Sequence, residues 1–71
     1  MTDEAAAERY RASYRDEIDS ATVYRAIAAS ESRPEIAAVY ERLAEAEERH
    51  AAFWAERLEE VGATVPDGRP S

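Results

Sequence analysis

Pro34 is the residue that most constrains the fold of this chain. Between residues 2 and 61 it alone strongly opposes a helix, and the segments on both sides of it are rich in Ala, Glu and Arg, which favour one. A proline is tolerated in the first turn of a helix but not in its interior. The sequence therefore predicts two helices, over about residues 3–31 and about residues 33–61, with a break between them.

The residues around the break and near the chain end predict where the second helix begins and ends. Ser32 and Glu35 have the spacing of a capping box, so we expect Ser32 to be the N-cap of that helix. Gly62 is expected to cap its C-terminus. The predicted domain is then residues 1–62, and residues 63–71, with two Pro and a Gly, are expected to form a flexible tail or linker.

The length of the helices predicts the architecture. At about 1.5 Å per residue each helix would be roughly 42 Å long, and two such rods enclose no interior of their own. A chain of 71 residues without Cys also has no disulfide to stabilise it. Each helix carries an apolar stripe wide enough for more than one neighbour, so we expect an all-α fold, an antiparallel helical hairpin that dimerises into a four-helix bundle. The expected assembly is a homodimer or a higher homo-oligomer. The stripes are Tyr10, Tyr14, Glu17, Ala21, Tyr24, Ala28 and Glu31, and Ile36, Tyr40, Leu43, Glu47, His50, Trp54 and Val61.

Charge and hydropathy exclude two classes of partner. The formal net charge is −7, whereas proteins that bind nucleic acid concentrate Lys and Arg to contact phosphates. No apolar run approaches the roughly 20 residues that span a bilayer, and the acidic first residues do not form a signal peptide. We therefore expect no nucleic acid, no membrane contact by this segment itself, and a cytoplasmic location, with the cytoplasmic face of a membrane or a protein compartment as alternatives.

Two carboxylates and an imidazole interrupt the apolar stripes. Glu17 lies in the middle of the first helix, Glu47 in the middle of the second, and His50 follows Glu47 by about one turn on the same side. If the turn centres on Ser32, Glu17 and Glu47 lie level with each other across the hairpin. The same register pairs Tyr14 with His50, Tyr24 with Tyr40 and Tyr10 with Trp54.

This arrangement predicts a metal site. An unpaired ionised carboxylate costs several kcal/mol in an apolar interior unless a cation or hydrogen bonds offset it. A two-fold axis through the helix midpoints would bring together four Glu and two His, and Glu with Glu-x-x-His is the recurring ligand set of di-metal carboxylate sites in bundle cores. We expect Tyr24 and Tyr40 to pack in the core or to hydrogen-bond the ligand carboxylates. Tyr10, Tyr14, Phe53 and Trp54 are expected to be packing residues.

A metal-free interpretation of the same residues stays open. An Ala- and Glu-rich helix with one His produces Glu-x-x-His by chance, and buried polar residues can set the register of paired helices. In that case Glu17, Glu47 and His50 hydrogen-bond with one another, and the protein is a structural helical dimer.

Residues 14–58 resemble the ferritin-like superfamily, specifically one half of a rubrerythrin-type four-helix bundle. The resemblance is carried by Glu17 and the Glu47-x-x-His50 motif, in which the two Glu lie 30 positions apart. The chain is similar to encapsulated ferritins, which are single hairpins that complete a ferroxidase site on dimerising. It also resembles the N-terminal ferritin-like domain of membrane iron transporters of the vacuolar iron transporter type.

The resemblance implies a ferroxidase. Two iron ions per dimer would be shared across the interface, with Glu17, Glu47 and His50 as both ligands and catalytic residues, and Fe(II) would be oxidised by O2 for iron storage, detoxification or delivery. The absence of Cys means that the chain lacks the rubredoxin-type electron donor of rubrerythrins. The resemblance also implies an alternative, a non-catalytic domain that binds or senses iron or another divalent metal and is tethered to a membrane iron transporter.

Overall fold

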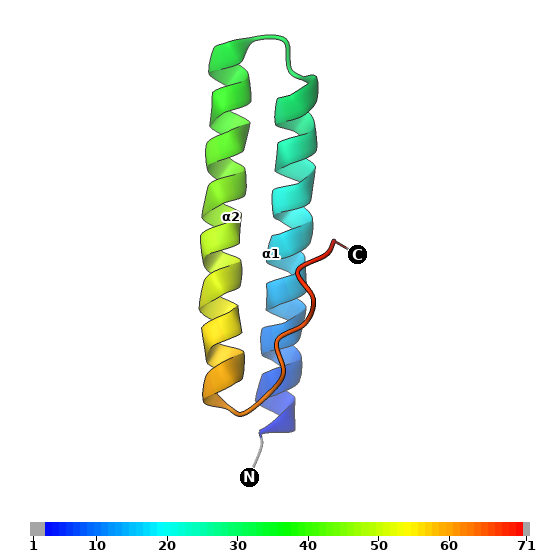
Figure 1. The fold of residues 1–71 in the computed structure, drawn as a ribbon, viewed down its shortest axis with the longest axis vertical. Coiled ribbons are helices and arrows are strands. Elements are labelled where there is room, and N and C mark those ends of the chain that lie inside the picture. The colour runs from blue at the N-terminus through cyan, green and yellow to red at the C-terminus, as the bar shows by residue number, and fades with distance from the viewer. Residues whose placement is uncertain (1–2, 71) are drawn as a thin grey trace.

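The computed structural model describes residues 3–70, which form two antiparallel helices and a C-terminal segment (Figure 1). Helix α1 is Glu4–Ser30 and helix α2 is Pro34–Glu60, each of 27 residues. The predicted all-α hairpin is therefore confirmed, with helix ends within one residue of those expected from the sequence. Residues 1, 2 and 71, part of the predicted domain and tail, lie outside the described residues. Neither described helix is long and apolar enough to cross a membrane.

The turn between the helices differs from the predicted capping box. Arg33, not Ser32, is the N-cap residue of α2, no side chain caps that helix, and Pro34 occupies its first turn. The reason is that a residue before proline favours extended backbone, and Arg33 has φ −90° and ψ 112°. Glu31 stabilises the turn instead, because its Oε1 accepts hydrogen bonds from Arg33 N at 3.1 Å and Arg33 Nε at 2.9 Å.

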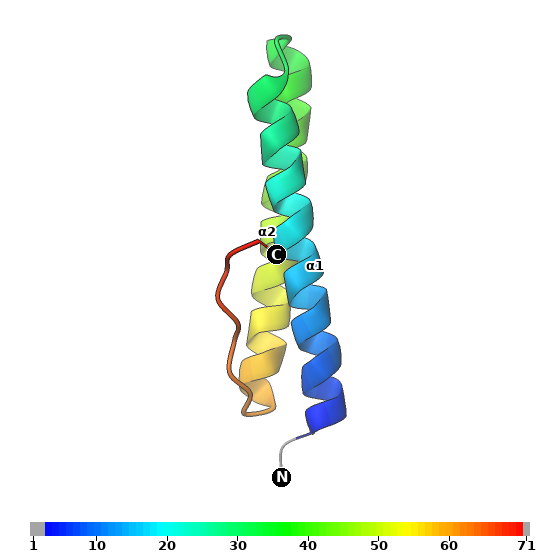
Figure 2. The ribbon, with the colours of Figure 1, turned by 90° about the vertical axis from the view of Figure 1, so that its right-hand side faces the viewer.

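Gly62 ends α2 as predicted. Its φ of 73° lies in the left-handed region, which favours glycine. Gly62 N donates to Glu59 O at 3.0 Å and Ala63 N donates to Leu58 O at 2.9 Å, the pair of bonds that defines a Schellman motif. This cap reverses the chain, so that the following residues run back along the helix pair (Figures 1 and 2).

The two helices meet along a seam of small side chains. Leu58 is the only large side chain that is fully buried among the described residues. Small residues let two helix backbones approach closely, but they bury little apolar area, so one hairpin has only a thin core. On α2 the buried seam is offset by one residue from the predicted stripe. The large apolar residues of that stripe border the seam and do not fill it. The buried series, seven residues apart, are Ala7, Tyr14, Ala21 and Ala28 on α1 and Ala44, Ala51 and Leu58 on α2.

The predicted register is confirmed by its aromatic pairs. The rings of Tyr24 and Tyr40 have centroids 6.1 Å apart, and those of Tyr10 and Trp54 stack at 5.7 Å. The structure gives the expected partners Tyr14 and His50 other neighbours. Tyr14 lies in the seam with its hydroxyl beside the C-terminal segment, whereas Nδ1 of His50 faces carboxylates.

Candidate metal centre

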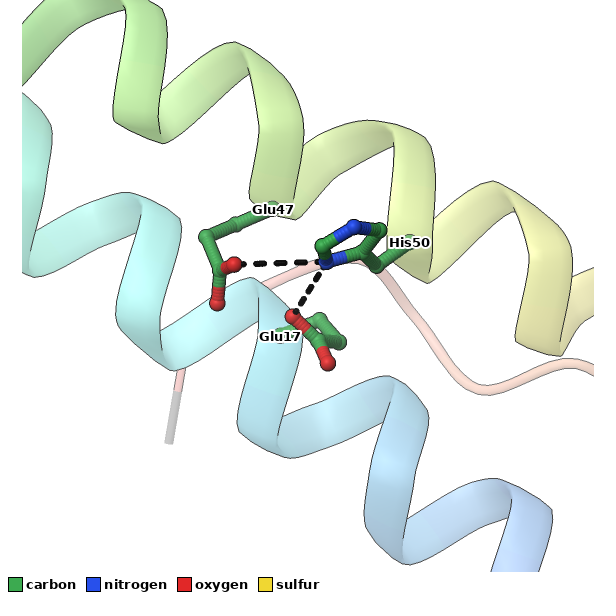
Figure 3. Close-up of side chains that lie close together, drawn as sticks. All are labelled: Glu17, Glu47 and His50. Carbon is green, nitrogen blue, oxygen red and sulfur yellow. Dashed lines mark ion pairs between the residues drawn. The ribbon is translucent and has the colours of Figure 1, made fainter.

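Glu17, Glu47 and His50 come together midway along the hairpin (Figure 3). Nδ1 of His50 lies 3.5 Å from Glu17 Oε2 and 3.3 Å from Glu47 Oε1. One donor atom of each residue lies within 4.8 Å of the others. The structure thus assembles the same three residues that the sequence places on one level.

Helix geometry explains this convergence. Glu47 and His50 are three residues apart on α2, so their side chains leave the helix on the same side, about one turn apart. The cross-helix aromatic pairs fix the sliding of α1 against α2. Tyr24–Tyr40 lies two turns from the carboxylates on one side and Tyr10–Trp54 two turns on the other, since each residue is seven positions from its glutamate. The register that forms these stacks also brings Glu17 to Glu47.

The three side chains differ in burial. Those of Glu17 and Glu47 are 23% and 22% exposed, whereas that of His50 is 59% exposed. Glu17 Oε2 is buried and accepts no hydrogen bond, with the His50 imidazole at 3.5 Å as an ion-pair partner. Burial raises the pKa of Glu17 above its ordinary value, the neighbouring Glu47 carboxyl raises this pKa further, and His50 partly opposes both. The hairpin alone therefore leaves the Glu17 carboxylate incompletely compensated.

The donor set fits a divalent transition metal. Carboxylate oxygens and an imidazole suit iron, manganese or zinc. Bonds of about 2.1 Å place neighbouring donors of one ion about 3 Å apart. The 3.3 Å and 3.5 Å separations from His50 Nδ1 are close to that spacing, and one donor atom of each residue lies within 4.8 Å of the others. An ion would also satisfy Glu17 Oε2, the atom that lacks a hydrogen bond.

Arg57 is a feature of the surroundings that sequence reasoning did not identify. Its guanidinium lies 5.7 Å from the ring centroid of Tyr10 and 5.8 Å from that of Phe53. Phe53 in turn packs edge-on against Trp54, with centroids 5.0 Å apart. The helical spacing of Phe53, Trp54 and Arg57 was the available signal, because residues three or four apart share a helix side. These contacts support the packing role expected for Tyr10, Phe53 and Trp54, at the end of the hairpin where α2 ends.

Comparison with known proteins identifies the family. The family model described as Rubrerythrin matches residues 8–68, which covers α1 from residue 8 onward, all of α2 and most of the segment after it. No curated protein and no solved structure matches the chain. Proteins of the matched family typically bind iron. The match spans most of the chain, and the hairpin and the carboxylate–histidine cluster agree with it, so this protein belongs to the rubrerythrin family of the ferritin-like superfamily.

Proposed function

We propose that this protein is a ferroxidase module, in which two copies share a di-iron centre and oxidise Fe(II) to Fe(III) with O2. The observation that carries the proposal is the cluster of Glu17, Glu47 and His50, with its buried and unsatisfied Glu17 oxygen, in a member of an iron-binding family. Each Fe(II) substrate ion gives up one electron, and O2 accepts both electrons together with two protons from the solvent and leaves as hydrogen peroxide.

The protein's part is to bind the iron ions and to balance their positive charge. Glu17 and Glu47 supply hard anionic oxygens, and His50 supplies an imidazole nitrogen. Four carboxylates from two copies balance the charge of two divalent ions, which makes an otherwise costly cluster electrically neutral. Tyr24 and Tyr40 pair on the side of the site nearer the turn, and we propose that their hydroxyls support the carboxylates.

A second copy of the chain is the partner that the proposal requires. Val39, Leu43 and Phe53 are exposed and follow the same side of α2 as His50. A second hairpin packed on this side would cover these apolar side chains and bring a second set of ligands to the first. Homodimerisation would thereby supply both the missing core and the missing ligands.

Aerobic addition of Fe(II) to the purified protein tests the proposal. We expect rapid growth of ferric absorbance near two irons per dimer, and its loss in Glu47→Ala, because that variant lacks a carboxylate of the cluster. Glu56→Ala is the matched control, because Glu56 is an exposed glutamate of the same helix with no part in the cluster. Stoichiometric binding without oxidation would instead support the metal-binding or sensing domain. Absence of binding would support the metal-free helical dimer.

A further inference from the structure

The C-terminal segment packs against α1. Tyr14 is only 8% exposed, and its hydroxyl oxygen lies 3.3 Å from where a Cβ at Gly68 would stand. Ala63, Val65 and Pro66 are half-buried, although they belong to no helix. Gly68 has no positive φ, so its small size, not its backbone freedom, is what this contact uses. The segment therefore makes a fitted contact with an aromatic residue of the helix seam.

Two local features direct the segment to this place. The Schellman motif at Gly62 reverses the chain directly after α2. Further on, Arg69 Nε lies 3.2 Å from Asp67 Oδ2, across the glycine that faces Tyr14. Figures 1 and 2 both show the segment following the lower half of the helix pair up to about half its height.

The segment lies on the side of the hairpin opposite the proposed metal ligands Glu17, Glu47 and His50. We call the side of the segment the rear side and the side of these three residues the ligand side. In Figure 3 the three ligand side chains stand in front of the helices, and the segment passes behind them. The cross-helix ion pair between Arg25 and Glu48, with one contact of 2.6 Å and one of 3.2 Å, lies on that rear side too. Glu48 and His50 flank the seam residue Ala51 on opposite sides of α2, since they precede it by three residues and by one.

We propose that residues 63–70 are an intramolecular strap that closes the rear side of the hairpin and leaves the ligand side as the one on which a second copy docks. The inference rests on the proposed function for the identity of that copy. Without the strap, the buried Tyr14 side chain would be uncovered on the rear side, so hairpins could add on both sides and form open-ended stacks. With the strap on one side, association stops at the dimer that joins two sets of ligands.

The metal-free full chain and a chain that ends after Thr64 test the strap. The shortened chain keeps the bond from Ala63 N to Leu58 O, so α2 keeps its cap. In the full chain we expect backbone order parameters of about 0.8 for residues 65–68, and a dimer at every concentration measured by light scattering. The shortened chain should retain its helical circular dichroism and assemble beyond the dimer as its concentration rises.

A substitution in the full chain gives an independent measurement. Gly68→Val places a branched side chain against the Tyr14 hydroxyl, so we expect the order parameters of residues 65–69 to fall below about 0.6 and assembly to resemble that of the shortened chain. Gly68→Ala is the graded control, because a single methyl group at 3.3 Å requires only a small shift of the tyrosine. Gly68→Val in a Tyr14→Phe background should regain part of the order, since the opposing oxygen is gone.

Order parameters of a free tail in the full chain, or unchanged assembly in both the shortened chain and Gly68→Val, would overturn the strap. The first result would instead support the flexible tail expected from the sequence. Failure of the proposed function has a different signature, because an ordered strap would then accompany a protein that does not oxidise Fe(II). Failure of the strap alone would leave Fe(II) oxidation intact.

Discussion

The two broad sides of this hairpin are built differently. The ligand side carries exposed apolar residues of α2 together with His50, and the inter-helix polar contact there is the cluster of His50 with Glu17 and Glu47. The rear side is closed by an Arg25–Glu48 ion pair and by the C-terminal segment over Tyr14. Both sides border the same thin seam of alanines. The contrast teaches that the hairpin covers one of its sides by itself, whereas the other side leaves apolar side chains exposed and Glu17 Oε2 without a hydrogen bond.

The largest expected effect comes from a charge in the middle of the ligand side. Leu43→Glu places a carboxylate on the surface proposed to bind a second copy, and two-fold symmetry would place two such charges in one interface. Burying or juxtaposing them costs several kcal/mol, so the dimer dissociation constant should rise by roughly 100-fold or more. Analytical ultracentrifugation measures this change.

The control for that variant is Val23→Glu. Val23 is an exposed apolar residue of α1, and it points directly away from the seam because it follows Ala21 by two residues. The Val23→Glu substitution should leave the dimer dissociation constant unchanged. Equal dissociation by both variants would mean that general surface charge, not a specific ligand-side interface, controls association.

A seam substitution tests the element that the two sides share. Ala44 is fully buried, so Ala44→Leu forces α1 and α2 apart and should lower the free energy of unfolding by about 1–3 kcal/mol. Urea denaturation of the metal-free protein measures the loss. Ala52→Leu adds the same side chain at an exposed position of α2 and should be nearly neutral. A neutral Ala44→Leu would show that the helices do not need alanine to approach.

The seam also shows what the sequence could predict and what it could not. Pro34 and Gly62 predicted the helix ends well, because each acts on the backbone of its own neighbours. The level of Glu17 and Glu47 followed from the position of the turn alone, since two antiparallel helices of equal length have one natural register. The inner seam of α2 did not follow, because Ala44 and Ala51 are too weakly hydrophobic to stand out among larger neighbours.

Contacts between distant residues were the hardest part to predict. Nothing in the pattern around Gly68 indicates that it faces Tyr14, because that contact depends on the path of the chain after the cap. The N-cap of α2 was misplaced for a different and local reason. The Ser32–Glu35 spacing suits a capping box, but the extended backbone that proline imposes on Arg33 makes Arg33 the cap residue.

Glu17→Gln is expected to have a moderate effect whose sign depends on metal. The substitution removes a buried, poorly compensated negative charge beside Glu47, so the metal-free protein should gain about 1 kcal/mol of stability. The same variant should lose most of the increase in melting temperature that added metal gives to the unsubstituted protein. Calorimetry with and without metal measures both. Destabilisation of the metal-free protein would mean that the His50–Glu17 ion pair is a structural element and not a ligand pair.

The smallest effect is expected on the rear side, from Glu48→Gln. Arg25, through its hydrogen bonds and its charge, holds the pKa of the Glu48 carboxyl below its ordinary value. A lowered folded-state pKa means that the stabilisation is present above the unfolded-state pKa and is lost as the pH falls through the folded-state pKa.

Because the pair is exposed and screened by salt, Glu48→Gln should lower the melting temperature only slightly at neutral pH and low salt. The difference from the unsubstituted protein should vanish in strong acid or at high salt. A large loss at neutral pH that salt leaves unchanged would show that this ion pair, and not the strap, is the main closure of the rear side.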